Sequence, residues 1–541
     1  MSKQDVEVGS SPHHSPHLKV KSISAQLLAA CSKYLIMLNI GMGISYPTIA
    51  IPPILNSSTG LSLNQDEASW FASLVFIWQP VGSITSVPMS GLGRKRSMFY
   101  LQIPLFIAWI LPFFAETVWE LYIAASIMGL GIGFMQAPIA TYIGEVTLPQ
   151  YRGLLACIAY CFLTLGSVCV YAIDVIVGNW RYTALYCAVM PPLTAILLYI
   201  IPESPIWLVS QGRYAEAKKA LSWLRGWVAE SEVEQEFKTM LIHNSPKFAA
   251  LVDNEIPSVS GGFEMDSNEQ VKNETYKELK DEQSNVTQTD VDTGLEITKP
   301  KKTEDEKEKD TNWSGNKKEE EPFIRFIGRP EMYRPLLLSA VYLYLSNGIG
   351  VAAFRPYLVL IFRDFRIEFI DEYIATIAVT TIGLVGNIAS VVLMPLIGKR
   401  RLTIIAIISC AVGCFGIGIY KVIDDYQPIP PNMTWLAIAF MIAIFFATNL
   451  AVGHMPWVLM SEIFPLRGRT LATGVVAGFG NFVQFLGTKL FITYVDEMYL
   501  SGTFFMYGAT FMVGLIYLYF FLIETEGRSL DDIVTMFRGK Q

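Results

Sequence analysis

Apolar runs long enough to cross a bilayer dominate this sequence, and they fall into two sets of six. A helix needs about 20 apolar residues to span the hydrocarbon core of a membrane. The first set covers residues 25–54, 68–90, 98–117, 119–145, 153–178 and 181–201, and the second covers residues 335–362, 371–397, 402–422, 435–460, 470–494 and 503–523. We therefore predict an all-α membrane protein with twelve transmembrane helices in two six-helix halves.

The composition argues against an ordinary soluble protein and against a nucleic-acid-binding one. Hydrophobic residues make up 52% of the chain and charged residues only 16%, and the net charge of -7 includes no basic patch of the kind that binds nucleic acid. All seven cysteines lie in apolar runs, a pattern that indicates neither a disulfide framework nor a zinc site. We expect no metal and no cofactor.

Charge and composition outside the apolar runs predict the domain organisation. The segments are an N-terminal tail (1–22), a first helical bundle (23–201), a central loop (202–332), a second bundle (333–523) and a C-terminal tail (524–541). The central loop begins with an amphipathic helix at Tyr214–Arg225. It continues through a charged stretch at 250–321 that cannot bury enough apolar surface to fold. A solvated linker is the simplest interpretation of this stretch, and a regulatory or partner-binding role is the alternative.

The distribution of Lys and Arg predicts the orientation. If the N-terminus is cytoplasmic, the short inner loops carry more positive residues than the outer loops, as the positive-inside rule requires. Both termini and the central loop are then cytoplasmic. Residues 1–22 are polar, so we expect no cleavable signal peptide there and expect the first apolar helix to target the chain. Two sequons, at Asn56 and Asn432, fall outside and are candidate glycosylation sites.

Three short motifs recur in the same order in the two halves. A glycine followed by basic residues comes after spans two and eight, and Glu and Arg seven residues apart come after spans four and ten. The third pair, PESPIWL and ETEGRSL, follows spans six and twelve. This repetition predicts a duplicated six-helix unit, as in transporters that rock two halves about a site near the bilayer midplane.

The repeated charged residues stand at helix ends where the helix dipole opposes them, with glutamates at C-terminal ends and arginines at N-terminal starts. We therefore expect each to have a partner on a neighbouring helix. Ion pairs that bridge the halves would hold the inner face shut, and we interpret these residues as a breakable inner lock. The alternative is that the cations only follow the positive-inside rule. The candidate gating residues are Arg94, Glu145, Arg152, Arg400, Glu462 and Arg469.

These motifs resemble the sugar porter family of the major facilitator superfamily over nearly all of both halves. The segments that carry the resemblance are GRK at 93–95, GEVTLPQYRG at 144–153, PESPIWLVSQGR at 202–213, EAKKALSWLRG at 216–226, PWVLMSEIFP at 456–465 and ETEGRSLDDI at 524–533. Within the family, residues 41–55, 67–74 and 501–511 most resemble insect facilitated trehalose transporters. The resemblance implies the major facilitator fold and facilitated diffusion of a sugar, such as trehalose or a hexose, across the plasma membrane.

The sequence departs from the family pattern where the family binds sugar. In span seven, Ser346 and Asn347 stand at a family Gln-Gln pair and Ala352 stands at a family asparagine. In span five, Tyr160 replaces a family glutamine, and in span ten a new histidine precedes the retained Trp457. An unpaired polar group in a dry cavity costs about 1–3 kcal/mol. Transport of a different small solute therefore stays open as an alternative.

Several polar or aromatic residues in the spans are candidates for substrate contacts. Trp457 offers a flat face for a sugar ring, and Asn347 lies beside Gly348 and Gly350, which allow the helix to break at a cavity. Helix packing or interhelical hydrogen bonding is the alternative for each. The candidate substrate-binding residues are Tyr160, Ser346, Asn347, Trp457, Asn481 and Gln484.

His454 and Arg355 are candidate functional residues because burying them in a span is unfavourable. His454 could sense pH or could be a neutral hydrogen-bonding partner between helices. Arg355 could bind an anionic solute or could extend outward toward Asp371 and Glu372.

The resemblance and the residues together predict a uniporter that works by alternating access. Proton-coupled relatives carry a carboxylate in span one, where this chain has none at Gly41–Ser45, and the clearest acid within a span is Asp174. A proton-coupled or anion transporter is one alternative, and a non-transporting nutrient receptor is another. No nucleophile with a positioned base stands out, so we expect no enzyme activity. The expected partners are a small solute and membrane lipid, without nucleic acid, and the expected state is a monomer.

Overall fold

The computed structural model describes residues 16–146, 152–244, 329–367, 370–430, 433–465, 469–526 and 530–538. The chain divides into two units. The larger comprises residues 1–204, 224–227 and 328–541, and the smaller comprises residues 205–223 and 228–327. The larger unit contains both helical halves.

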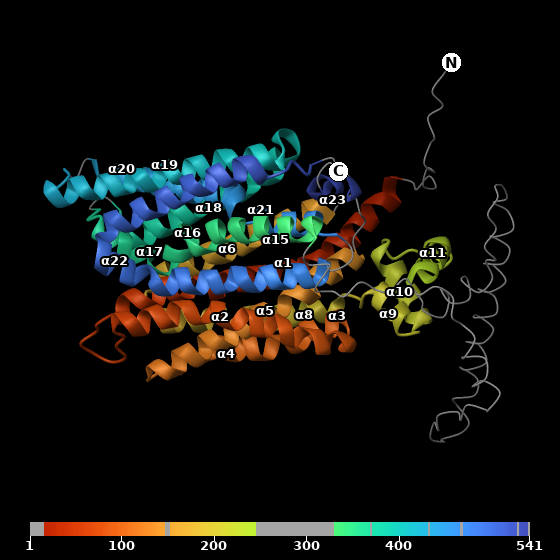
Figure 1. Cartoon of the computed structure of the whole chain (residues 1–541). Coiled ribbons are helices and arrows are strands. Elements are labelled where there is room, and N and C mark those ends of the chain that lie inside the picture. The colour runs from red at the N-terminus through yellow and green to blue at the C-terminus, as the bar shows by residue number, and fades with distance from the viewer. Residues whose placement is uncertain are drawn as a thin grey trace, which may run out of the picture. The chain divides into compact units, whose positions relative to one another are not determined.

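The first half contains α1 to α8 (Figure 1, red to yellow). Its helices are α1 (Pro16–Ile54), α2 (Gln65–Met89), η1 (Ser90–Leu92), α3 (Arg94–Tyr100), α4 (Gln102–Phe114), α5 (Val118–Val146), α6 (Arg152–Val177), α7 (Trp180–Cys187) and α8 (Met190–Ile200). The predicted third span corresponds to α3 with α4, and the sixth to α7 with α8.

The second half follows the same order (Figure 1, green to blue). Its helices are α15 (Pro330–Leu343), η4 (Tyr344–Gly348), α16 (Val351–Phe354), η5 (Arg355–Tyr357), α17 (Leu358–Asp364), α18 (Glu372–Ile397), α19 (Lys399–Tyr426), α20 (Trp435–Ala447), η7 (Thr448–Val452), α21 (Met455–Ile463), α22 (Arg469–Phe521) and α23 (Leu530–Arg538).

The described helices account for the twelve predicted spans. Ten are long and apolar enough to cross a membrane by length and composition. The 25-residue α2 is not among the ten, and α22 consists of two helices joined at Tyr499, where φ is 58°. Adding α2 and dividing α22 gives twelve, so the prediction of an all-α membrane protein with this number of spans is confirmed.

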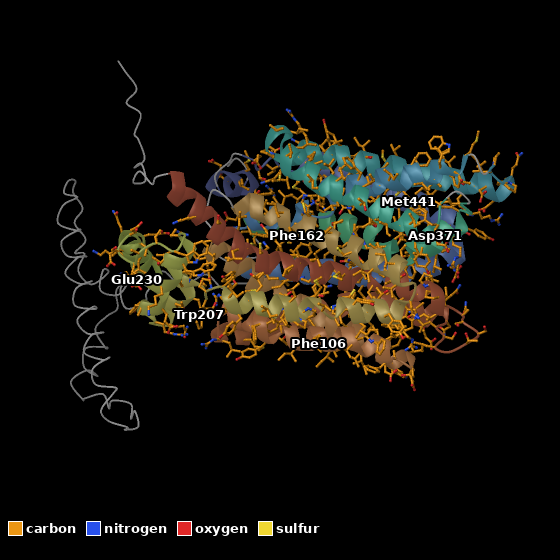
Figure 2. The ribbon with its side chains drawn as sticks, turned by 180° about the vertical axis from the view of Figure 1, so that it is seen from behind. Phe106, Phe162, Trp207, Glu230, Asp371 and Met441 are labelled. Carbon is orange, nitrogen blue, oxygen red and sulfur yellow. The ribbon has the colours of Figure 1, made fainter. Side chains whose placement is uncertain are left out.

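The outside of the larger unit is covered by apolar side chains. Phe106 on α4 lies on this outer surface (Figure 2), and Ile176, Tyr199 and Phe520 are among the most exposed large side chains. An apolar exterior of this extent would be unfavourable in water, and lipid hydrocarbon would cover it.

Close backbone contacts hold α1 against α6. A Cβ atom added at Gly41 would lie 1.8 Å from the carbonyl oxygen of Leu163, and one added at Gly166 would lie 2.0 Å from the carbonyl oxygen of Leu38. Only glycine allows two helices to approach this closely. The crossing therefore depends on both positions.

Two helices of the second half are interrupted near their middle. The seventh span widens into the π-helix η4 and then turns at Gly350, whose φ of 65° favours glycine. The tenth span widens into the π-helix η7 before α21 begins. Such interruptions are frequent at functional sites, and the break beside Gly348 and Gly350 agrees with the prediction for span seven.

The smaller unit is a separate helical cluster. It contains α9 (Pro205–Ser210), α10 (Tyr214–Leu224) and α11 (Glu234–Asn244), which pack through Trp207, Leu221 and Phe237, and an ion pair joins Lys218 to Glu234. The predicted amphipathic helix at 214–225 is thus confirmed as α10. The charged stretch at 250–321 lies outside the described residues, and the domain boundaries remain predictions.

Candidate functional site

Polar side chains of the two halves meet about midway along their helices. Asn387 on α18 donates from Nδ2 to Thr164 Oγ1 on α6 at 2.7 Å and to Asn449 Oδ1 on η7 at 3.2 Å. The Thr164 hydroxyl also donates to Asn449 Oδ1 at 3.3 Å. All three residues are buried. Hydrogen bonds between buried polar groups therefore connect the halves at this level.

His454 lies directly beside this cluster, immediately before α21. Its Nε2 is 2.9 Å from the hydroxyl of Ser390 on α18, and its ring centroid is 5.4 Å from that of Tyr160 on α6. The Nδ1 atom is buried and has no hydrogen-bond partner within the described residues. Buried polar groups are almost always paired, so this unpaired nitrogen is a candidate contact for a ligand.

Ser346 and Asn347 are buried in η4 and bond to backbone groups of the second half. The Ser346 hydroxyl donates to the carbonyl of Gly453 at 3.2 Å and to Asn347 Oδ1 at 3.1 Å, and Asn347 Nδ2 donates to the carbonyl of Gly480 at 3.4 Å. The widened η4 turn thus brings the seventh span to the start of α21 and to the middle of the eleventh span.

The other candidate residues lie on the same elements. Asn481 follows Gly480 and is buried, whereas Gln484 and Trp457 are partly buried. The backbone amide of Trp457 donates to the carbonyl of His454 at 3.1 Å. The structure therefore places Tyr160 beside His454, and Ser346, with its neighbour Asn347, beside the preceding residue Gly453. The side chains of Trp457 and Gln484 have no hydrogen bond to these residues in the described part of the chain.

Sequence reasoning missed four residues of this region: Thr164, Asn387, Ser390 and Asn449. Each is a polar residue within an apolar span, and polar groups inside a membrane usually bond to neighbouring helices. That signal was present in the sequence. It is weak because many other serines and threonines in the spans bond only to their own helix, as Ser73 does with the carbonyl of Ser69.

The end of the larger unit that carries residues 93–96 and 398–401, here called the basic end, holds a charged cluster in each half. In the first half, Arg94 Nη2 is 3.1 Å from Glu145 Oε1, and the hydroxyl of Ser204 donates to Glu145 Oε2 at 2.5 Å. Glu203 accepts the backbone amide of Lys95 at 2.9 Å. Glu145 thus pairs with a cation, and Glu203 accepts a hydrogen bond from a backbone amide.

The second half repeats this arrangement. Lys399 Nζ lies 2.6 Å from Glu462 Oε1 and 3.1 Å from Glu526 Oε2, and the hydroxyl of Thr525 donates to Glu462 Oε2 at 2.7 Å. Glu524 accepts the backbone amides of Lys399 and Arg400 at 3.0 and 3.1 Å. The cluster therefore fastens α19 to α21 and to the segment after α22.

The described ion pairs at the basic end join residues of the same half, whereas we expected pairs between the halves. The guanidinium of Arg400 donates to the carbonyl of Tyr519 at 2.6 Å, and the residue that pairs with Glu462 is its neighbour Lys399. The side chains of Arg152 and Arg469 lie outside the described structure. Their part in a lock stays a prediction.

An ion pair that does join the halves lies at the opposite end. Lys489 Nζ on α22 is 2.5 Å from Asp66 Oδ1 at the start of α2 and 2.7 Å from the hydroxyl of Ser69. The same ammonium lies 4.6 Å from the centroid of the Trp70 ring. Sequence analysis did not identify this pair. It fastens the second half to the first at the end away from residues 93–96.

Arg355 is partly buried between the halves and has no side-chain hydrogen bond within the described residues. Its backbone carbonyl accepts the Thr48 hydroxyl of α1 at 3.0 Å. The carboxylates considered as partners are used elsewhere: Glu372 pairs with Arg363 at 3.0 Å, and Asp371 accepts the backbone amide of Tyr373 at 2.8 Å. The guanidinium is therefore left without an acidic partner in this part of the structure.

Asn56 is exposed just after α1, as a glycosylation site requires, and Asn432 lies outside the described residues. Within the described ranges, no group of three or more His, Cys, Asp or Glu side chains could hold a metal ion.

Residues 26–254 and 276–537 match the family model described as "Sugar (and other) transporter". The chain belongs to this sugar transporter family. It is 24% identical to the facilitated trehalose transporter Tret1 of Polypedilum vanderplanki over 96% of this chain and 89% of that protein. It is 25% identical to the Tret1 of Drosophila mojavensis over 96% of this chain, and it spans 52% of the length of that relative.

The fold is that of the major facilitator superfamily. The solved inward-open structure of the xylose transporter XylE from E. coli, a protein of that superfamily, matches with a TM-score of 0.65 and 18% identity over 95% of this chain and 99% of that chain. As a member of the sugar transporter family, the chain is a multi-pass membrane transporter and not an enzyme.

Proposed function

We propose that this chain carries a neutral sugar, such as trehalose or a hexose, by facilitated diffusion, with its two ends opening alternately. The observation that carries the proposal is the buried polar cluster where the halves meet, beside the free Nδ1 of His454. Sugar hydroxyls donate and accept, and amides, hydroxyls and an imidazole supply the complementary groups. The relatives described as facilitated trehalose transporters support the same substrate class.

In this proposal the sugar replaces contacts that the halves now make with each other. A sugar beside His454 would bond to Nδ1 and to Asn387 or Asn449, while Tyr160 and Trp457 provide aromatic faces. Ser346, Asn347, Asn481 and Gln484 would complete the site from η4 and α22. Exchange of interhalf hydrogen bonds for bonds to the substrate would allow the halves to move with little net change in hydrogen bonding.

Uniport is favoured over proton coupling by the placement of acids. Helix α1 contains no Asp or Glu. Asp174, the clearest acid within a span, accepts a hydrogen bond from the hydroxyl of Thr183 at 3.0 Å, near the end of α6. It lies ten residues beyond Thr164 along α6, away from the polar cluster. We also propose the plasma membrane as the location, with both termini cytoplasmic.

Gating in this proposal differs between the two ends. The pair of Lys489 with Asp66 holds its end closed in the described conformation, and the charged clusters at the basic end keep each half rigid. Arg152 and Arg469 are the residues proposed to carry a lock between the halves at the basic end in the other conformation.

Transport of an anionic solute is the second candidate function. It is favoured by the guanidinium of Arg355, which lies between the halves without an acidic partner in the described structure. Uptake of a small carboxylate or phosphate compound, with no uptake of neutral sugars, would favour this candidate.

Uptake into proteoliposomes tests the proposed function. The purified chain is expected to give saturable flux of labelled trehalose or glucose without a pH gradient. Trp457→Ala is expected to raise KM roughly two- to twelvefold, because an aromatic contact contributes about 0.5–1.5 kcal/mol. Trp435→Ala, at an exposed position on α20, serves as the control. Absence of saturable flux for every neutral sugar would remove the sugar proposal, and flux that needs a pH gradient would remove uniport.

Lys489→Met is expected to raise about threefold the population of the conformation that is open at the end away from residues 93–96. The reason is that an exposed ion pair contributes about 0.2–1 kcal/mol. Pulsed electron paramagnetic resonance between spin labels at Thr59 and Glu497 measures the separation of the halves there, in a background without reactive native cysteines. Lys489→Arg keeps the charge and should leave the distances unchanged. If Lys489→Met gives the wild-type distance distribution, the pair does not hold this end closed.

A further inference from the structure

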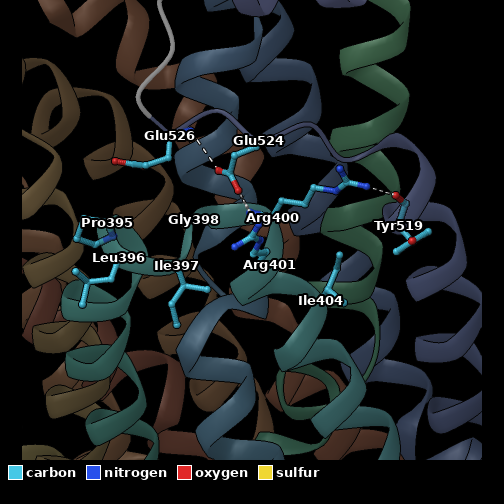
Figure 3. A pocket seen from close by; sticks show the side chains of 10 residues that line it. All are labelled: Pro395, Leu396, Ile397, Gly398, Arg400, Arg401, Ile404, Tyr519, Glu524 and Glu526. Atoms are coloured by element: carbon cyan, nitrogen blue, oxygen red, sulfur yellow. Dashed lines mark hydrogen bonds between the residues drawn. The ribbon is translucent and has the colours of Figure 1, made fainter.

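A cavity of about 580 Å³ opens at the basic end of the second half (Figure 3). It lies where α18 ends, α19 begins and α22 ends, and its volume is within the usual range for ligand pockets. The lining residues include Leu396, Arg400, Arg401, Ile404, Tyr519 and Glu524. None of them belongs to the polar cluster between the halves.

The walls of this cavity are of two kinds. Leu396, Ile404 and Tyr519 provide an apolar side, and Leu396 is 75% exposed. Charged groups line the other side, where the helices end. An apolar wall next to charged groups at the end of a transmembrane bundle is the environment of a lipid headgroup and its upper acyl chains.

The carboxylates of the cavity are already engaged. Glu524 accepts two backbone amides at the start of α19, and Glu526 pairs with Lys399 at 3.1 Å. Arg400 is held by its hydrogen bond to the carbonyl of Tyr519, over the ring of the same residue. Arg401 is exposed and makes no hydrogen bond or ion pair in the described structure. Among the charged side chains that line the cavity, Arg401 is thus the one without a hydrogen bond or ion pair in the described structure, and its guanidinium can accept an anionic partner.

We infer that this cavity binds an anionic phospholipid from the leaflet at the basic end, with Arg401 pairing with the headgroup phosphate. A guanidinium matches phosphate oxygens with two parallel hydrogen bonds. Leu396, Ile404 and Tyr519 contact the upper part of the acyl chains. A lipid bound here touches α18, α19 and α22 together, so its presence stabilises the second half. This binding is separate from the proposed sugar site and does not require transport.

Native mass spectrometry of the full chain in detergent tests the inference. Phosphatidylglycerol is expected to bind at least fivefold more tightly than phosphatidylcholine with the same acyl chains. Arg401→Gln should remove that preference, because one basic residue near an anionic headgroup contributes about a fivefold gain in affinity. The matched control is Arg96→Gln, since Arg96 is exposed at the corresponding position of the first half and carries the same charge.

A second variant and a soluble competitor make the result decisive. Ile404→Trp fills the apolar side without altering charge and should also weaken phosphatidylglycerol binding. The inference is overturned if Arg401→Gln keeps the wild-type preference, or if Arg96→Gln loses as much of it. It is also overturned if millimolar inorganic phosphate displaces the lipid completely, since the site would then bind a soluble anion.

Discussion

Glu462→Gln is expected to lower the stability of the second half by about 2 kcal/mol, less than the loss of one partner from a fully buried ion pair would cost, because the Glu462 side chain is 27% exposed. The Lys399 side chain is only 7% exposed and lies 2.6 Å from Glu462. The amide cannot balance its charge, and Glu526 alone would remain as a carboxylate partner. Because Glu462 also accepts the Thr525 hydroxyl, the segment after α22 should loosen with it. The midpoint of thermal unfolding, followed by fluorescence-detected size exclusion, measures the loss.

Two further variants calibrate this result. Glu216→Gln breaks the pair with Arg213 in the smaller unit, where the Glu216 side chain is 56% exposed, and should change stability by less than about 0.5 kcal/mol. The loss of stability caused by Glu145→Gln should lie between these two losses, because Arg94 is more exposed than Lys399. Equal unfolding midpoints for Glu462→Gln and Glu216→Gln would show that the cluster at Lys399 does not stabilise the second half.

Gly41→Ala is expected to destabilise the first half by about 3 kcal/mol, the upper part of the range for overpacking. The added methyl group would lie 1.8 Å from the carbonyl oxygen of Leu163, a backbone atom that cannot rotate away. Helices α1 and α6 would have to separate by more than 1 Å to reach a contact distance of 3.0 Å. Since α6 carries Tyr160 and Thr164, uptake should fall together with the unfolding midpoint.

The control for Gly41→Ala is the same substitution at Gly474 on α22. A Cβ atom there would meet no other atom within 4 Å, so Gly474→Ala should be neutral or slightly stabilising through helix propensity. A similar unfolding midpoint for the two variants would contradict the close α1–α6 crossing.

The sequence was sufficient to predict the fold because each spanning helix needs its own apolar run, and the repeated motifs revealed the duplication. It also singled out Glu145 and Glu462 of the clusters at the basic end, whereas Glu203, Glu524 and Glu526 stood only within the repeated motifs PESPIWL and ETEGRSL. It could not identify Lys399 as the partner of Glu462, because successive residues of a helix point about 100° apart and three adjacent cations offer three directions. Only the packing of α19 against its neighbours selects one of them.

Contacts between the halves were the least predictable part. Asp66 and Lys489 are 423 positions apart, and no local pattern connects them. Likewise, Asn387 and Thr164 lie in runs whose polar residues face several neighbours, so periodicity alone does not show which of them face the other half. The family resemblance directed attention to motif positions such as Trp457 and away from these residues.

The placement of the π-helices makes the duplicated halves mechanically unequal. Both η4 and η7 belong to the second half, whereas the described first half has the continuous helices α1 and α5 at the corresponding places. Single π-helical turns inside α-helices are rare but are frequent at functional sites. Local bending during the transport cycle should therefore occur mainly at η4 and η7 in the second half, while the helices of the first half move as a rigid group.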